Sequence, residues 1–242
     1  MNLETYLLRK KEIEKSQTKF RELCVKCLQP EFSCYCSQLQ PFDPRIKFAI
    51  LMHPIEHKRR IATGRMSHLS LQHSELLVGQ NYTENVQLNS LLSDISYQPV
   101  ILYPGRMSLN LSTTSENEKK KILPDSKKLL ILVIDGTWAT ARRMMKQSQN
   151  LISLPRVCFT PSAPSRFRVR KQPGVECYST IEAIHQTIEL LGSTVGFETE
   201  SRKHDRLLEV FDQMVERQLQ FIRHAYDNPK PGTYRKPRYR VA

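Results

Sequence analysis

The residues with the clearest chemical potential follow one hydrophobic run. Residues 129–134 are six consecutive aliphatic side chains, a pattern typical of a strand buried on both faces of a parallel sheet. Asp135, Gly136, Thr137 and Trp138 come next, so a carboxylate, a glycine, a hydroxyl and the only tryptophan of the chain stand together. Ligands of open α/β sheets bind just beyond the carboxyl ends of strands, and we therefore expect a site here.

Each of these side chains also has a purely structural interpretation. Asp135 or Thr137 could cap a following helix, and Trp138 could be a large core residue. As functional groups, Asp135 could accept a proton or hold the edge of a base, Thr137 could donate to a carbonyl, and Trp138 could stack on a base. The residue types alone leave both interpretations open.

Four of the six cysteines lie within thirteen residues, namely Cys24, Cys27, Cys34 and Cys36. A Cys-x-x-Cys pair and a Cys-x-Cys pair joined by a short loop can supply the four thiolates of a tetrahedral zinc site, which would be structural because no ligand position stays open. A redox pair or two disulfides are the alternatives, although disulfides are disfavoured in the cytoplasm. Cys158 and Cys177 lie far from this cluster in sequence, and we expect them to be buried apolar side chains.

The net charge of +13 is large for 242 residues and would attract polyanions. No acidic residue occurs between Ala139 and Gly174, and the last fifteen residues are again free of acids and carry tyrosines among basic residues. Basic side chains neutralise phosphates and aromatic rings stack on unpaired bases, so we predict RNA contacts in both stretches. The arginines assigned to these contacts are Arg142, Arg143, Arg166, Arg168, Arg170, Arg235 and Arg238.

Three of these arginines alternate along the chain. In an extended segment Arg166, Arg168 and Arg170 would all face one side, and such a row of guanidinium groups suits an RNA backbone. The alternative is a solvated edge strand defended by its charges. For residues 228–242 the alternative is a tail that only keeps the chain in solution.

Hydrophobic runs alternate with helical patterns, which predicts an α/β domain with a parallel sheet. The expected strands are residues 47–52, 100–103, 129–134 and 156–160, and the expected helices are residues 67–73, 139–149, 179–191 and 204–226. We divide the chain into an N-terminal helix with the cysteine knuckle (1–42), the α/β domain (43–226) and a basic, disordered tail (227–242). No run suits a membrane helix or a secretory signal, so we expect a cytoplasmic protein without membrane contact.

Several ordered blocks resemble the DTW-domain family of tRNA-uridine aminocarboxypropyltransferases. Residues 135–138 resemble its D-x-T-W signature, residues 163–170 its basic segment and residues 178–183 its S-T-x-E-A block, and with the cysteines the resemblance spans residues 24–215. It implies a SPOUT-like α/β fold whose knotted C-terminal half shapes a pocket for S-adenosylmethionine. It also implies transfer of the 3-amino-3-carboxypropyl group to N3 of a uridine in the variable loop of tRNA, with release of methylthioadenosine.

The resemblance further implies roles for particular residues. Asp135, Thr137 and Trp138 are the expected catalytic residues, with Asp135 taking the N3 proton or positioning the ring. The residues expected to bind S-adenosylmethionine are Thr63, Gly64, Arg65, Gly136, Ser179, Thr180 and Glu182. Residues 61 and 62 (Ile-Ala) replace the polar pair of the family's T-N-T-G-R loop, so contacts from those two side chains are not carried over. Ser179 and Glu182 are also spaced as a capping box, which would explain both without a ligand.

Two other functions are compatible with this sequence. A methyltransferase of the same fold would move a different carbon of the same donor, because the sulfonium activates all three attached carbons and orientation decides which one reacts. A non-catalytic RNA-binding module could be built from a zinc knuckle and a basic face alone.

Overall fold

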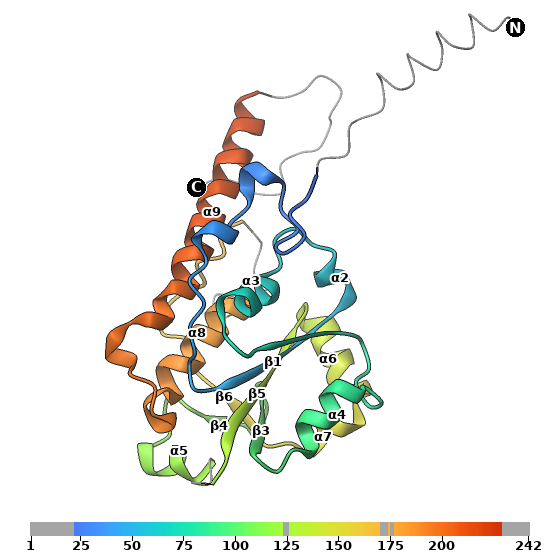
Figure 1. The fold of residues 1–242 in the computed structure, drawn as a ribbon, viewed down its shortest axis with the longest axis vertical. Coiled ribbons are helices and arrows are strands. Elements are labelled where there is room, and N and C mark those ends of the chain that lie inside the picture. The colour runs from blue at the N-terminus through green and yellow to red at the C-terminus, as the bar shows by residue number, and fades with distance from the viewer. Residues whose placement is uncertain (1–21, 123–125, 170–173, 175–176, 229–242) are drawn as a thin grey trace, which may run out of the picture.

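The structure, a computed structural model, describes residues 22–122, 126–169, 174 and 177–228. Within these ranges one sheet of six strands lies between two layers of helices (Figure 1). The strands are β1 (Lys47–Met52), β2 (Glu75–Val78), β3 (Tyr97–Leu102), β4 (Leu109–Asn110), β5 (Lys128–Asp135) and β6 (Arg156–Cys158). Their order is β2-β1-β5-β3-β6-β4 and every pairing is parallel, so the predicted parallel α/β fold is confirmed.

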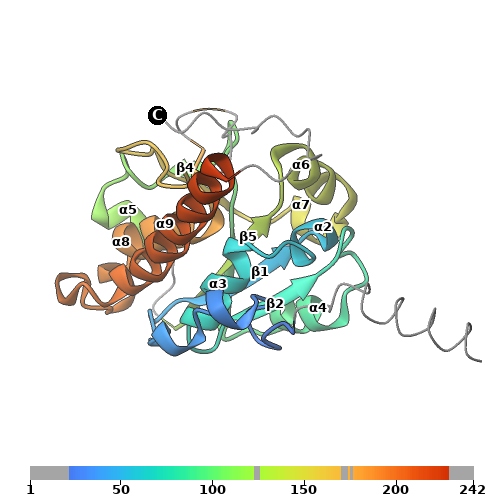
Figure 2. The same cartoon turned by 90° about the horizontal axis from the view of Figure 1, so that it is seen from above.

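Helices cover both faces of the sheet. The α-helices are α2 (Pro54–His57), α3 (Thr63–Ser70), α4 (Val86–Ser93), α5 (Glu116–Ile122), α6 (Trp138–Gln147), α7 (Gln149–Ile152), α8 (Thr180–Leu191) and α9 (Arg206–Asp227). Short 3-10 turns are η1 (Glu31–Ser33), η2 (Cys36–Gln38), η3 (Ser193–Val195), η4 (Thr199–Ser201) and η5 (Lys203–Asp205). Figure 2 shows α3, α8 and α9 on one side of the sheet and α4, α6 and α7 on the other.

The aliphatic run of β5 is buried on both faces, as its sequence predicts. Leu129, Ile131 and Val133 join the hydrophobic cluster that includes α3, α8 and α9, whereas Leu130 and Leu132 join the cluster that includes α4, α6 and α7. Each such side chain contributes roughly 1.5–3 kcal/mol when it leaves water. Two-sided burial fixes the position of β5 between β1 and β3, and with it the place where Asp135 ends the strand.

The cysteine knuckle, residues 24–36, packs directly on this fold. Cys27 and Tyr35 are buried in the same cluster as α8 and α9. The ring of Phe32 meets the ring of Phe221 on α9 edge to face, with centroids 5.6 Å apart. In Figure 1 the knuckle, in dark blue, accordingly lies beside α9.

Two local expectations are corrected by the structure. Residues 63–65 were expected in a loop before a helix at 67–73, but they form the first turn of α3, which ends at Ser70. The glycine at position 64 weakens the helical signal of the sequence, and tertiary packing overrides it. Residues 166–169 were expected to be extended, but the chain turns at 168–169 and the amide of Arg168 donates to the carbonyl of Arg166 at 2.8 Å.

Candidate active site

A cavity of about 340 Å³ opens where β3, β5 and β6 end. Its walls include the loops after these strands and the first turns of α6 and α8. The side chains with aromatic or polar character in its lining are Tyr103, Trp138, Cys158, Phe159, Cys177, Tyr178 and Thr180. This is the edge at which open α/β sheets bind ligands, and the volume is in the range of small-molecule sites.

Asp135 lies buried beside the cavity, between α3 and α8. The hydroxyl of Thr180 donates a 2.5 Å hydrogen bond to its Oδ1 atom, and a Cβ placed on Gly64 would lie only 2.5 Å from Oδ2. The backbone carbonyl of Asp135 accepts from the amide of His53 at 2.9 Å. The carboxylate therefore meets the first turns of two helices, whose N-terminal dipoles favour negative charge. Its neighbours Ile134 and Gly136 line the cavity itself.

The first turn of α8 carries the predicted capping box. The backbone amide and the hydroxyl of Ser179 both donate to Glu182, at 2.8 and 2.5 Å. Glu182 also accepts from the hydroxyl of Ser165 at 2.8 Å and from the amide of Arg166 at 2.6 Å. The Glu182 carboxylate thus fastens the segment at residue 165 to the start of α8, and this is its observed role.

The other side chains of the Thr63–Arg65 segment lie behind Asp135 rather than on the cavity wall. Arg65 is buried and donates to the backbone carbonyls of His57, the last residue of α2, and of Arg59, two residues further on. Thr63 is buried at the start of α3. Contact of Thr63 and Arg65 with S-adenosylmethionine therefore stays a prediction. Gly64 has a structural role, because its missing side chain leaves room for the Asp135 carboxylate.

Trp138 stands at the mouth of the cavity with 41% of its side chain exposed. Its indole N–H donates to the sulfur of Cys177 at 3.2 Å, and its ring lies tilted by 59° to that of Tyr103 with centroids 6.5 Å apart. An indole with this exposure is not a core residue, and its ring is accessible to a ligand in the cavity. Thr137, directly before it, caps α6 by accepting from the amide of Thr140 at 3.2 Å.

Several cavity residues were missed at the sequence level. Cys158 and Cys177 were expected to be buried apolar side chains, but both are only half-buried and line the cavity. Burial still raises the pKa of the Cys158 thiol. Tyr103 was expected as the last residue of the strand at 100–103, but β3 ends at Leu102. Tyr103 is half-buried at the cavity, where burial raises the pKa of its phenol. Tyr178 lies in the S-T-x-E-A block itself, so its position before α8 was a usable signal.

The arginines assigned to RNA lie in two groups. Arg142 and Arg143 are exposed on α6, about one helical turn after Trp138. Arg166 pairs with Asp212 at 2.8 Å and Arg168 with Glu216 at 3.2 Å, and both acids belong to α9. These exposed pairs contribute little stability, so phosphates could compete for both guanidinium groups. The remaining residues of this set, Arg170, Arg235 and Arg238, lie outside the described residues.

The four N-terminal cysteines converge on one point. Their sulfur atoms all lie within 4.8 Å of one another, with Cys24 and Cys36 3.7 Å apart and Cys27 and Cys34 3.6 Å apart. Zn–S bonds of about 2.3 Å in a tetrahedron require S–S edges of about 3.8 Å, so the cluster is compatible with zinc. The backbone amides of Cys27 and Lys26 lower the pKa of the Cys24 thiol to about 6, which favours the thiolate that a metal binds. Burial, in contrast, raises the pKa of Cys27.

Fold and site together define an α/β protein with a cavity of small-molecule size at the carboxyl edge of a parallel sheet. Residues 21–219 match the model of the DTW domain family, and the chain belongs to that family. Across the described ranges, no helix combines the length and the apolar character that a bilayer crossing requires.

Curated relatives share the same name with different suffixes. The chain is 30% identical over 181 residues to tRNA-uridine aminocarboxypropyltransferase 2 of Drosophila melanogaster, covering 72% of this chain and 68% of the relative. It is 28% identical over 178 residues to the Mus musculus protein of that name, covering 71% of this chain but only 57% of the relative. It is also 24% identical over 232 residues to tRNA-uridine aminocarboxypropyltransferase A of Arabidopsis thaliana, covering 87% and 86%. No solved structure shows a significant match.

Proposed function

We propose that this chain is a tRNA-uridine aminocarboxypropyltransferase. It transfers the 3-amino-3-carboxypropyl group of S-adenosylmethionine to N3 of a uridine in the variable loop of tRNA. Membership of the DTW domain family and the names of the curated relatives support this activity. The observation that carries the proposal is the cavity at the carboxyl edge of the sheet, which combines an exposed indole with a buried carboxylate beside its floor.

This cavity, called the donor cavity below, suits S-adenosylmethionine in its size and in the aromatic and polar side chains of its lining. The rings of Trp138, Tyr103 and Tyr178 offer faces for a purine, and the start of α8 offers backbone amides to a carboxylate. Gly136 lies on the wall, where a Cβ would come within 2.6 Å of the Thr140 hydroxyl oxygen. S-adenosylmethionine would therefore be held at its purine and at its carboxylate. This orientation decides which carbon next to the sulfonium faces the uridine.

The reaction itself is one displacement. N3 of uridine attacks the carbon of the amino acid arm next to the sulfonium, the carbon–sulfur bond breaks, methylthioadenosine leaves, and the N3 proton passes to a base. The Asp135 carboxylate lies beside the cavity and serves as the base or as the group that positions the ring. Thr180, which donates to its Oδ1 atom, holds the carboxylate at the cavity edge.

The finer features of the family follow the same proposal. One structural zinc is held by Cys24, Cys27, Cys34 and Cys36, with support from the close approach of their sulfur atoms. The free thiols suit the reducing cytoplasm. We divide the chain into the knuckle region (1–42), the catalytic domain (43–226) and a basic tail (227–242). The wholly parallel sheet supports a SPOUT-like fold, and the knot rests on the family resemblance alone.

The test is to incubate the purified chain with S-adenosylmethionine and unmodified tRNA and to weigh the digested nucleosides. We expect a uridine that carries the aminocarboxypropyl group, with methylthioadenosine as the second product. A gain of one methyl group with S-adenosylhomocysteine would identify a methyltransferase instead. Tight tRNA binding with no modified nucleoside would identify an RNA-binding module.

A further inference from the structure

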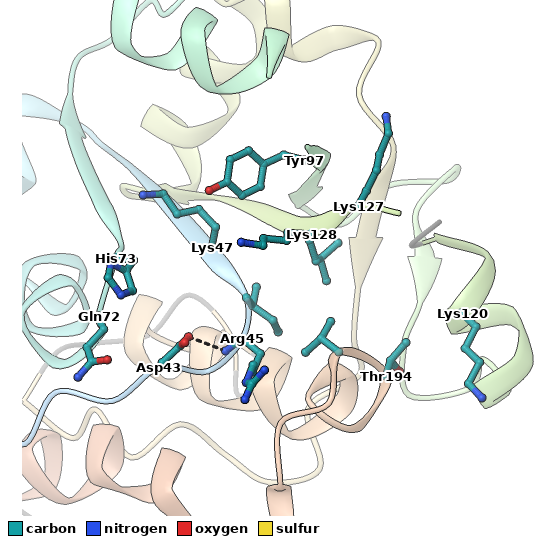
Figure 3. A pocket seen from close by; sticks show the side chains of 13 residues that line it. Asp43, Arg45, Lys47, Gln72, His73, Tyr97, Lys120, Lys127, Lys128 and Thr194 are labelled. Carbon is teal, nitrogen blue, oxygen red and sulfur yellow. Dashed lines mark hydrogen bonds between the residues drawn. The ribbon is translucent and has the colours of Figure 1, made fainter. Parts of the chain in front are cut away.

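A second, larger cavity lies at the opposite edge of the sheet, where strands begin. It measures about 590 Å³, and Lys47, Tyr97 and Lys128, the first residues of β1, β3 and β5, line it (Figure 3). Strand β5 starts at this cavity with Lys128 and ends beside the other with Asp135. At about 3.3 Å per residue, the two sites are separated by roughly 23 Å along that strand.

This basic cavity gathers charge from segments far apart in sequence. Its lining includes five lysine or arginine side chains, Arg45, Lys47, Lys120, Lys127 and Lys128, and one acid, Asp43. Figure 3 shows Lys47 and Lys128 extending toward the same space from neighbouring strands. Such a concentration of one sign raises the local positive potential and favours an anionic ligand.

Among the described residues, the basic side chains of this cavity that form no ion pair lie at its rim rather than at its floor. Lys47 is half-buried and pairs with Glu75 at 2.7 Å. Arg45, Lys120 and Lys128 are exposed, and among the ion pairs of the described residues none involves them or Lys127. A small ligand inserted into the floor would meet a neutralised lysine, whereas a polyanion that crosses the rim would meet four lysine or arginine side chains.

The backbone and the neighbouring surface agree with a built site. Arg45 and His73 both line the cavity in the left-handed conformation, with φ of 60° and 59°, and strained backbone of this kind gathers at binding sites. The Asp43 carboxylate accepts from the amide of Arg45 at 2.8 Å and fixes that turn. Asp43 and Arg45 also line an adjoining hollow, which adds two cations, Lys203 and Arg206, and one acid, Glu198.

We propose that this basic cavity binds backbone phosphates of the tRNA, as a second contact away from the reacting uridine. The inference rests on the proposed function, because it takes tRNA as the polyanion. Flexible lysines acting as point charges suit phosphates of varying position, and the rim charges lie along a surface instead of converging on one atom. The contact adds affinity without selecting the base that reacts.

The experiment measures tRNA affinity of the full-length chain by fluorescence anisotropy over a range of salt concentrations. We expect Lys128→Gln to reduce the slope of log affinity against log salt by about one, and the double change with Lys127→Gln by about two. At about 0.1 M salt each lost contact should weaken binding roughly five- to eightfold. Lys121→Gln, on the same helix as Lys120 but not in the cavity lining, is the matched control and should leave the slope unchanged.

Two results would overturn the inference. One is a salt slope that stays the same in the cavity variants, or that falls equally in Lys121→Gln. The other is saturable binding of ATP that Lys128→Gln abolishes while the tRNA slope is unchanged, which would make the cavity a site for a small phosphorylated molecule.

Nucleoside mass analysis of the same proteins separates this inference from the proposed function. A chain that binds tRNA through Lys128 but modifies no uridine would refute the transferase and keep the phosphate site. A chain that modifies uridine with an unaltered slope in the variants would refute only the phosphate site. Affinity for S-adenosylmethionine, measured by calorimetry, should be the same in wild type and Lys128→Gln, because the donor cavity lies at the other end of β5.

Discussion

Gly64 and Asp135 occupy neighbouring space that has no room for a side chain at position 64. A Cβ there would lie 2.5 Å from Oδ2 of Asp135, 2.8 Å from its Cγ and 3.0 Å from Cε of Met52. The first turn of α3 can approach the end of β5 only because residue 64 is glycine. The glycine thereby allows the carboxylate to sit between α3 and α8, next to the donor cavity.

Gly64→Ala should damage both the fold and the activity. The added methyl must displace Asp135 or α3, and such overpacking typically costs about 1–3 kcal/mol of unfolding free energy. Gly105→Ala is the matched control, because a Cβ there would meet its nearest atom, Oγ of Ser108, at an ordinary 3.4 Å. Urea unfolding and transfer assays check both variants. Full activity of Gly64→Ala would mean that the position of Asp135 is unimportant.

The hydrogen bond from Thr180 to Asp135 should matter for rate. Thr180→Val keeps the shape of the side chain but removes the hydroxyl that donates the hydrogen bond. The loss of a hydrogen bond to a charged group costs about 1.5–3 kcal/mol. Where this bond is stronger in the transition state than in the ground state, its loss should slow transfer about ten- to a hundredfold. Thr180→Ser retains the hydroxyl and should recover most of the rate in single-turnover assays. Equal rates for the serine and valine variants would show that the hydroxyl has no part in the reaction.

The single tryptophan should report donor binding. Trp138 is 41% exposed at the cavity mouth, so a ligand that covers it changes its surroundings. S-adenosylmethionine or methylthioadenosine should therefore alter the intrinsic fluorescence in a saturable manner. Trp138→Phe keeps a ring for stacking and should weaken donor binding less than Trp138→Ala, as measured by calorimetry. If saturating S-adenosylmethionine left the fluorescence unchanged, it would bind outside the cavity that Trp138 lines.

The cysteine knuckle should contain metal. Elemental analysis should find about one zinc per chain, and a strong chelator should lower the unfolding temperature, because bound zinc contributes folding energy. Cys27→Ser removes a fully buried sulfur and should abolish zinc binding. Cys158→Ser, at the distant cavity, should keep the metal content of the wild type. A folded, metal-free chain with normal stability would contradict the zinc assignment.

Hydrophobic periodicity and residue spacing within short segments predicted much of the fold. The aliphatic run of β5, the strand at residues 47–52 and the capping box at Ser179 each depend on neighbours in sequence, so periodicity and spacing could predict them. The cysteine cluster could be predicted for the same reason. The two-residue strand β4 has too short a pattern for such a prediction.

Contacts between distant segments could not be predicted in this way. The sequence around Gly64 predicts a loop. The need for a glycine there follows only from its contact with Asp135, which lies 71 positions later in the sequence. The donor cavity takes Tyr103 from the loop after β3 and Phe159 from the loop after β6, and the adjacency of these strands is not encoded in either pattern. The basic cavity likewise joins cations from separate segments.

A buried histidine pair at the junction of α8 and η5 predicts a pH effect on stability. His185 and His204 stack with ring centroids 4.7 Å apart, and His185 contacts the Asp205 carboxylate at 2.8 Å. Burial lowers the pKa of His185, against the opposing effect of Asp205. Below the ordinary histidine pKa of about 6.5 the unfolded chain therefore binds a proton that the folded chain resists. The free energy of unfolding should fall as pH falls from about 6.5 toward the lower folded pKa.

The Asp205 carboxylate acts in the same direction at lower pH. Burial alone would raise the pKa of Asp205, but hydrogen bonds from Arg202 and His185 outweigh it and lower that pKa. Urea unfolding at pH 7.5 and 5.5 tests the histidine part. His185→Gln keeps a donor for Asp205 but cannot titrate, so it should lose less stability than the wild type over this interval. His224→Gln, exposed on α9, should behave as the wild type. The same loss in all three proteins would show that acid acts elsewhere in the fold.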